Sequence, residues 1–119
     1  MTNKKVALVT GASSGFGQLT AKKLAAVSYW VFGTSRKSHP ASVDVEMLTL
    51  DVTSDNSVQL CIKQLLTRTN RIDLLINNAG QIHASMLEET SLEQAKDMFE
   101  TNFWGVVRLT NAVLPVIGT

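Results

Sequence analysis

The chain has 119 residues, a globular composition (45% hydrophobic, 18% charged) and a formal net charge of +1, which together suit one domain with one core. Near-neutral charge without a Lys/Arg stripe excludes a typical nucleic-acid-binding or anionic-membrane surface. No apolar run is long enough to span a membrane, and the single cysteine, Cys61, excludes an internal disulfide, so we expect a soluble protein of the reducing cytoplasm.

Short apolar runs and helical spacings alternate along the first half of the chain. Residues 5–10 (KVALVT) form a continuous β-prone run, as expected for a strand buried on both faces. After a glycine-rich stretch, residues recur at helical spacing: Phe16, Leu19, Thr20, Leu24 and Val27. Residues 29–35 (YWVFGTS) predict a second strand, and residues 46–52 (EMLTLDV) predict a third strand that ends near position 51.

The clearest helical pattern follows the third strand. Its apolar stripe consists of Val58, Cys61, Ile62, Leu65 and Leu66. Thr53 or Ser54 is placed to cap the N-terminus of this helix. Residues 72–77 (IDLLIN) then predict a fourth strand.

A capping-box pattern, formed by Ser91 and Gln94, predicts the start of a long final helix. We expect this helix to end or kink at Pro115, because proline cannot continue the hydrogen-bond pattern. The residues predicted to point inward are Ala95, Met98, Phe99, Phe103, Val106, Leu109, Val113 and Leu114.

The alternation of buried strands with helices predicts parallel pairing, because each right-handed crossover between parallel strands needs a helix. We therefore expect an α/β fold, a Rossmann-like doubly wound sheet with helices on both faces and the strand order 3-2-1-4. A full doubly wound sheet has a second half. Residues 1–119 are thus expected to form an incomplete domain, truncated after the fourth strand and its following helix.

The segment TGASSGFG (residues 10–17) lies between the first strand and the first helix and carries Gly11, Gly15 and Gly17. Glycine lets backbone N–H groups approach a pyrophosphate, and a helix N-terminus places a positive dipole end beneath it. Ser13 and Ser14 add hydroxyl donors. The pattern indicates a phosphate-binding loop, although a simple tight turn would also use glycines.

Three further segments follow in order: DVT (residues 51–53) at the end of the third strand, NNAG (residues 77–80) at the end of the fourth, and Asn102 in the long helix. Together with TGASSGFG they closely resemble the short-chain dehydrogenase/reductase family, and the resemblance covers essentially the whole chain. It implies an oxidoreductase that transfers a hydride between a nicotinamide dinucleotide and a small carbonyl or alcohol substrate.

By this resemblance, the residues that line the cofactor's pyrophosphate and adenosine ribose are Gly11, Ser13, Gly15, Phe16 and Gly17. Asp51 would accept a hydrogen bond from the adenine amino group, with the backbone of Val52 beside it. Asn78, Ala79 and Gly80 would pass close to the ribose in the middle of the cofactor. Phe16 stands where the family more often has an aliphatic residue, a minor departure because the usual contact is through the backbone.

The end of the second strand discriminates between NADP and NAD. An acidic residue there would bind the ribose 2′-hydroxyl and repel a 2′-phosphate, but this sequence has TSRK (residues 34–37) instead. Ser35 can donate to phosphate oxygens, Arg36 supplies a permanently charged fork, and Lys37 adds a second positive charge. We therefore expect NADP to be preferred, the alternative being that Arg36 and Lys37 are solvated loop charges.

Asn102 is the one residue predicted to be catalytic. An amide among apolar helix neighbours needs a buried partner, which the neighbouring backbone could supply. The resemblance makes Asn102 a member of the family's catalytic tetrad, at a helix bend that organises a proton-relay water. This role would position water and transfer no proton from the amide itself.

Three other reactive side chains are assigned more ordinary roles. Cys61 lies on an apolar helix stripe and is predicted to be a core residue and not a nucleophile. His39 precedes a proline in a polar loop and has no partners at metal-ligand spacing, so we predict no metal site. His83 follows NNAG, where the family's substrate pocket begins, and faces either substrate or solvent.

The family's chemistry also requires a serine and a Tyr-x-x-x-Lys motif, and the only tyrosine here, Tyr29, opens the second strand. We expect the chain to be the cofactor-binding part of an oxidoreductase, and we expect this part to be inactive by itself. There are two alternatives: the chain is a non-catalytic nucleotide-binding or regulatory module, or it is a half-domain that assembles with another chain. An unpaired edge at the fourth strand further predicts self-association or a homo-oligomer.

Overall fold

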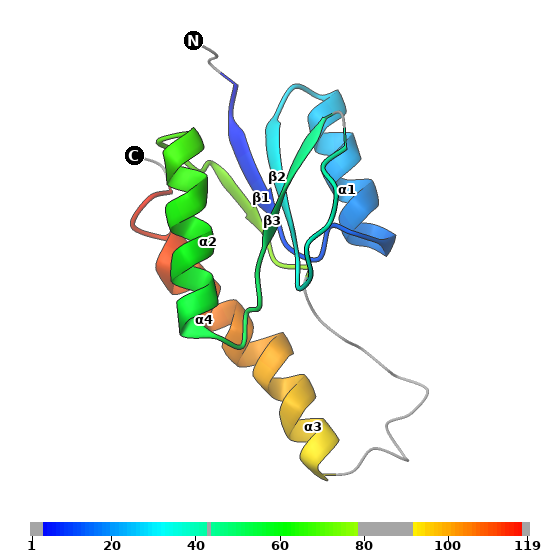
Figure 1. Cartoon of the computed structure of the whole chain (residues 1–119), viewed down its shortest axis with the longest axis vertical. Helices are drawn as coiled ribbons and strands as arrows, with labels where there is room; N and C mark the ends of the chain where they lie inside the picture. Colours follow the sequence, from blue (N-terminus) through cyan, green and yellow to red (C-terminus); the bar gives the residue numbers. More distant parts are fainter. Residues whose placement is uncertain (1–3, 43, 79–91, 118–119) are drawn as a thin grey trace.

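The computed structural model describes residues 4–42, 44–78 and 92–117, and Figure 1 shows the arrangement of the elements. In chain order these are β1 (Val6–Val9), α1 (Gly15–Ala26), β2 (Trp30–Ser35), β3 (Val45–Thr49), α2 (Asp55–Arg68), β4 (Leu74–Ile76), α3 (Leu92–Phe99), the π-helical turn η2 (Glu100–Trp104) and α4 (Gly105–Val113). The predicted alternation of strands and helices is confirmed, with strands slightly shorter than the patterns suggested.

The sheet is parallel, with the order β3-β2-β1-β4 that was predicted. Val6 of β1 pairs with Trp30 of β2, and Ala7 pairs with Leu74 of β4. Because all strands run in one direction, their carboxyl ends lie along one edge of the sheet. A further parallel bridge joins Ile72 and Ile117, which lie outside the named strands.

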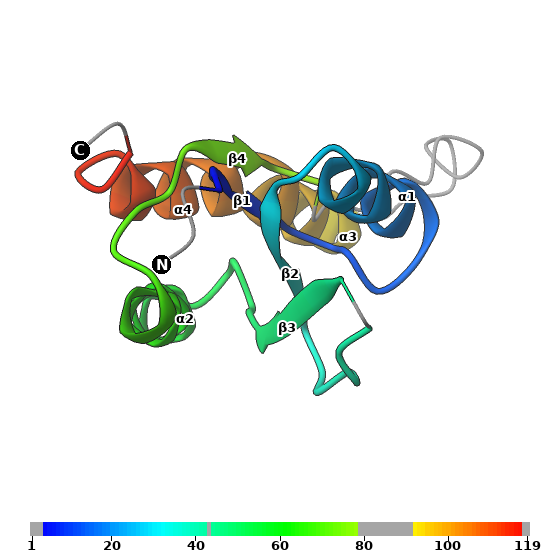
Figure 2. The same cartoon turned by 90° about the horizontal axis from the view of Figure 1, so that it is seen from above.

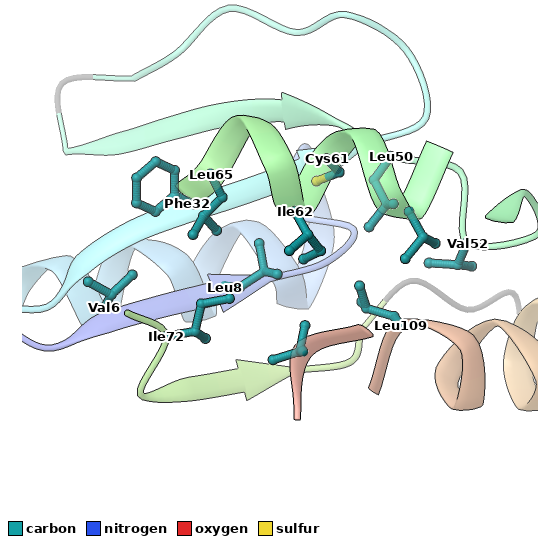
Figure 3. Packing of buried hydrophobic residues seen from close by; sticks show 12 residues of the cluster. Val6, Leu8, Phe32, Leu50, Val52, Cys61, Ile62, Leu65, Ile72 and Leu109 are labelled. Atoms are coloured by element: carbon teal, nitrogen blue, oxygen red, sulfur yellow. The ribbon is translucent and has the colours of Figure 1, made fainter. Parts of the chain in front are cut away.

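Helices cover both faces of the sheet, as Figure 2 shows from above. One face packs against α2 and α4 in a cluster of twelve buried residues, shown in Figure 3, that includes Leu8, Phe32, Leu65 and Leu109. The other face packs against α1 through smaller side chains, among them Ala21. All four residues of β1 are buried, which explains why the sequence reads as a continuous apolar run.

The buried face of α1 differs from the apolar spacing in the sequence. Phe16 is 81% exposed, and Leu19 and Val27 are also exposed, whereas Gly17 and Ala21 are the buried residues of the helix. The reason is the short distance between helix and sheet. A Cβ atom on Gly17 would overlap the carbonyl oxygen of Gly11, so only small residues fit on this face.

In α2, four of the five predicted core residues are buried, and Leu66 is exposed. Ser54 is the N-cap residue, and its side chain accepts a hydrogen bond from the amide of Ser57 at 3.2 Å. The proposed capping box at the start of the final helix cannot be described, because Ser91 lies outside the described residues.

The final helix is not the single inward-facing helix that was predicted. Leu109 and Val113 are buried and Val106 is half-buried, but the predicted core residues Ala95, Phe99, Phe103 and Leu114 are exposed. The π-helical turn adds residues between α3 and α4 and shifts the phase of the pattern. In addition, α3 extends past the end of the sheet (Figure 1), and its residues Leu92 and Phe99 are 73% and 56% exposed. The helix ends at Val113, two residues before Pro115, as expected.

Asp73 joins the beginnings of β4 and β1. Its Oδ2 atom accepts a hydrogen bond from the amide of Val6 at 2.7 Å. The guanidinium of Arg71 donates to both carboxylate oxygens, at 2.9 Å and 2.6 Å. Arg71, together with the Val6 amide, holds the pKa of Asp73 below its ordinary value, although partial burial opposes this.

Within the described residues, every helix is too short or too polar to cross a membrane.

We expect Asp73→Asn to destabilise the fold at neutral pH by about 1.5 kcal/mol, the lower end for a charged hydrogen bond because Arg71 is partly exposed. The pKa of Asp73 is lower in the folded than in the unfolded chain. Its contribution to stability is therefore complete above the unfolded pKa, about 4, and is lost as pH falls through the folded pKa. Urea titrations of the original chain and the variant at about pH 7 and about pH 3 measure this difference. Exposed Asp44→Asn is the control, and an equal loss at both pH values would contradict the prediction.

We expect Gly17→Ala to destabilise the chain by more than about 3 kcal/mol, because the new Cβ meets backbone atoms that cannot move aside. That Cβ would lie 2.5 Å from Nδ2 of Asn78 and 2.8 Å from the carbonyl carbon of Gly11. Gly15→Ala is the matched control: its φ of +59° costs about 1–2 kcal/mol of backbone strain, but no atom lies within 4 Å of the added Cβ. Urea unfolding of both variants tests the order, and a larger loss for Gly15→Ala would refute it.

Candidate functional site

A cavity of about 980 Å³ opens at the carboxyl ends of the strands. It is bordered by the loops that follow β1, β2, β3 and β4, and by the π-helical turn η2. The predicted site residues that line it are Gly11, Ser13, Ser14, Phe16, Ser35, Arg36, Asp51, Val52, Asn78 and Asn102. Open parallel sheets bind ligands in this position, outside the carboxyl ends of their strands.

Two glycines predicted to bind the cofactor are not part of the cavity lining. Gly15 is exposed, and Gly17 lies beneath the loop in contact with Gly11. The predicted residues Ala79 and Gly80 lie outside the described residues, as does His83. The glycine-rich loop therefore contributes directly through Gly11 and the two serines, with Gly17 supporting them from below.

The glycine-rich loop is fixed to the strands on both sides of β1. The amide of Ala12 donates to the carbonyl of Thr34 in β2 at 2.8 Å, and the amide of Thr10 donates to Ile76 in β4 at 3.0 Å. Gly11 and Gly15 adopt φ values of +61° and +59°, a left-handed conformation that favours glycine. The loop thus turns sharply into α1, whose first amides point towards the cavity end of the sheet.

Asn78 joins the end of β4 to the glycine-rich loop. Its backbone amide donates to the hydroxyl of Thr10 at 2.8 Å, and its side-chain Nδ2 donates to the carbonyl of Gly11 at 3.3 Å. The Thr10 hydroxyl in turn donates to the carbonyl of Ile76 at 3.4 Å. These bonds give the floor of the cavity a fixed shape before any ligand enters.

Asp51 presents a carboxylate at the end of β3. Its Oδ1 atom accepts hydrogen bonds from the hydroxyl and the amide of Thr53, at 2.6 Å and 3.0 Å. These bonds hold the pKa of Asp51 below its ordinary value, although burial opposes them, and the positive charges of Arg36 and Arg108 act in the same direction as the bonds. Asp51 is therefore ionised at neutral pH and can accept a hydrogen bond from a ligand.

Positive charge gathers where the chain leaves β2. Arg36 and Lys37 are exposed and line the cavity, together with Ser35. The hydroxyl of Ser35 donates to the carbonyl of Lys37, so its proton is already used within the loop. Arg36 and Lys37 are consequently the stronger candidates for binding an anionic group, while Ser35 shapes the loop that presents them.

Asn102 lies in the middle of η2, half-buried at the cavity. The residues around Asn102 form a π-helical turn, a rare geometry that is often found at functional sites. Thr101 and Val106 line the cavity with Asn102 and were not identified from the sequence. The helical spacing could have revealed Val106, since residues four apart share one face of a helix.

Other cavity residues were also missed or assigned other roles. Ser38, His39, Leu50 and Asn77 complete the lining, and the Nδ1 atom of exposed His39 lies 2.9 Å from the carbonyl oxygen of Pro40. Across the described parts of the chain, no group of three or more His, Cys, Asp or Glu side chains is placed to hold a metal ion. Cys61 is buried in the core, which raises the pKa of its thiol to about 11, and the prediction of a core cysteine is confirmed.

Comparison with known proteins gives consistent matches over nearly the whole chain. The chain is 43% identical over 111 residues to a 3-ketodihydrosphingosine reductase of Bacteroides thetaiotaomicron, covering 93% of this chain and 41% of that protein. It is 40% identical over 127 aligned positions to the uncharacterized oxidoreductase YusZ of Bacillus subtilis, covering 97% of this chain and 45% of that protein. The chain therefore spans less than half the length of these relatives.

A solved structure of a short-chain dehydrogenase from Streptomyces avermitilis superposes with a TM-score of 0.84 and 37% sequence identity. The match covers 98% of this chain and 45% of that one. The family model for short chain dehydrogenases matches residues 5–118. With the parallel sheet and the glycine-rich loop, these matches show that the chain belongs to the short-chain dehydrogenase family of oxidoreductases.

Proposed function

We propose that the chain binds NADP(H) in the cavity at the carboxyl ends of the strands and forms the cofactor-binding part of an NADP-dependent oxidoreductase. One observation carries this proposal: a single cavity gathers the glycine-rich loop, the ends of β3 and β4, and Asn102, which lie far apart in the sequence. On this proposal, residues 1–119 form an incomplete NAD(P)-binding domain. The single buried cysteine is consistent with a cytoplasmic location.

The groups around the cavity suit the parts of a dinucleotide. The glycine-rich loop and the N-terminal turn of α1 would hold the pyrophosphate, with Ser13 and Ser14 as hydroxyl donors. Asp51, ionised and oriented by Thr53, would accept a hydrogen bond from the adenine amino group beside Val52. Asn78 would lie near the ribose in the middle of the cofactor.

The preference for NADP over NAD depends on the residues after β2. Arg36 and Lys37 line the cavity where an acidic residue would otherwise bind a ribose 2′-hydroxyl. A guanidinium can donate two parallel hydrogen bonds to a phosphate group, and an ammonium adds a mobile point charge. Both cations favour the cofactor that carries a 2′-phosphate.

The chemistry supplied by a bound nicotinamide is the transfer of a hydride to or from a small carbonyl or alcohol carbon. Asn102 would position water for the accompanying proton movement. That movement also needs a proton donor, and Tyr29, the only tyrosine, precedes β2 at the edge of the sheet opposite the cavity. We therefore propose that these 119 residues bind nucleotide without turning over substrate.

We expect the chain to bind NADPH more tightly than NADH, and Arg36→Ala to reduce NADPH affinity by about tenfold to a hundredfold through loss of a charge-assisted hydrogen bond. NADH affinity should change little, because NADH lacks the 2′-phosphate. Calorimetric titration of both cofactors measures the preference, with exposed Lys63→Ala on α2 as the control for loss of one positive charge. Equal affinities of the unmodified chain for the two cofactors would refute the NADP assignment.

We expect the purified 119-residue chain to show no enzymatic oxidation of NADPH with ketones, aldehydes or quinones. Loss of a positioned general acid costs about 10²–10⁴-fold in rate. The lysine of the Tyr-x-x-x-Lys motif, which the family resemblance implies would orient the nicotinamide ribose, is missing as well and would weaken the reaction further. Absorbance at the nicotinamide band measures the rate, and binding of NADPH under the same conditions is the positive control. Turnover of about one per second or faster would contradict the prediction.

A further inference from the structure

Arg108 occupies a position in α4 where its guanidinium reaches three acceptors on three separate segments. Nη1 donates to the carbonyl oxygen of Val52 at 2.6 Å, after the end of β3. Nε donates to Oδ1 of Asp55 at 2.7 Å, in the first turn of α2. Nη2 donates to Oε1 of Glu100 at 3.1 Å, in the π-helical turn. One side chain therefore connects α2, η2 and the segment that follows β3.

Two of these segments form walls of the cavity. Asp51 and Val52 form one wall, and the turn that begins at Glu100 carries Thr101 and Asn102 into the other. Arg108 itself does not line the cavity. Its hydrogen bonds thus connect the two walls from outside the cavity lining. They do so at the first turn of α2, the end of that helix that lies close to α4 in Figure 1.

A second contact joins the same two segments independently of charge. A Cβ atom on Gly105 would lie 2.6 Å from Cγ2 of Val52, so the first turn of α4 rests directly on the Val52 side chain. Val52 is therefore held twice, through its carbonyl by Arg108 and through its side chain by Gly105. A change in this region would alter the width of the cavity at Val52 and at Asn102 together.

The arrangement depends on the shape of the guanidinium more than on its charge. Asp55 and Glu100 are 84% and 41% exposed, so their ion pairs are screened by water and contribute little by themselves. The Arg108 side chain is only 23% exposed, and its planar fork directs three different N–H groups at three fixed acceptors. A lysine ammonium would preserve the charge but could not span all three.

We propose that Arg108 is a positioning residue of the nucleotide site, which sets the separation between the Asp51–Val52 wall and the π-helical turn that carries Asn102. The identity of the ligand rests on the proposed function. The effect of Arg108 on the shape of the site does not rest on the proposed function, and it can be measured without nucleotide.

The first experiment follows amide hydrogen exchange in the nucleotide-free 119-residue chain. We expect Arg108→Gln to accelerate exchange by about tenfold in residues 52–54 and 100–105, with little change in β1 and α1. Arg108→Lys should resemble Arg108→Gln, because it lacks the fork. Arg68→Gln is the matched control: it removes an ion pair of 2.6 Å with Glu46, at a site away from the cavity lining.

Three results of this experiment would overturn the proposal. Unchanged exchange in residues 52–54 and 100–105 would show that Arg108 does not hold the walls. Equal acceleration throughout β1 and α1 would indicate a general loss of stability instead of a local role. Full rescue by Arg108→Lys would assign the effect to charge and not to the geometry of the guanidinium.

The second experiment measures NADPH affinity by calorimetry for the same variants. We expect about tenfold weaker binding for Arg108→Gln and unchanged binding for Arg68→Gln. Unchanged NADPH affinity in Arg108→Gln, with exchange accelerated as expected, would overturn a role in the nucleotide site. If the unmodified chain bound no NADPH, the proposed function would fail, and the exchange experiment would still decide whether Arg108 positions the two walls.

Discussion

The first turn of α1 can approach the ends of β1 and β4 only because residue 17 has no side chain. This approach places the helix N-terminus against Gly11 and Asn78, and it allows Asn78 to donate to the carbonyl of Gly11. The cavity floor follows from the same constraint, since the loop after β1 lies in direct contact with α1 at Gly17 and has no room to move towards the helix. Small residues on the inner face of α1 are therefore a requirement of the site as well as of the core.

The charged groups around the cavity are arranged so that opposite charges lie at different depths. Asp51 is half-buried and receives its hydrogen bonds from Thr53, whereas Arg36 is exposed. The positive charges of Arg36 and Arg108 both favour the ionised form of Asp51. On the proposed function, an entering nucleotide would meet the exposed cations first and the ionised Asp51 carboxylate second, an order that suits attraction of an anion before recognition of its base.

Much of the fold and site could be predicted because parallel strands bring their carboxyl ends to one edge, so motifs at strand ends must meet. The structure brings Ser13, Asp51 and Asn78 to the lining of one cavity in this way. Thr101 and the exposure of Phe99 could not be predicted from a regular period. A π-helical turn adds a residue to the helix, and each added residue rotates the remainder of the helix by about 100°. The inner face of α1 was missed because its glycine and alanine give no hydrophobic signal.

Cys61 lies on the inner face of α2, fully buried against the sheet, and its thiol resists ionisation. The thiolate is the form that attacks alkylating reagents, so the folded chain should be inert towards them. Modification then requires α2 to leave the sheet, which opens the same core that includes Leu109 and Val52. Because the chain has a single cysteine, the rate at which Cys61 is alkylated measures how often α2 separates from the sheet.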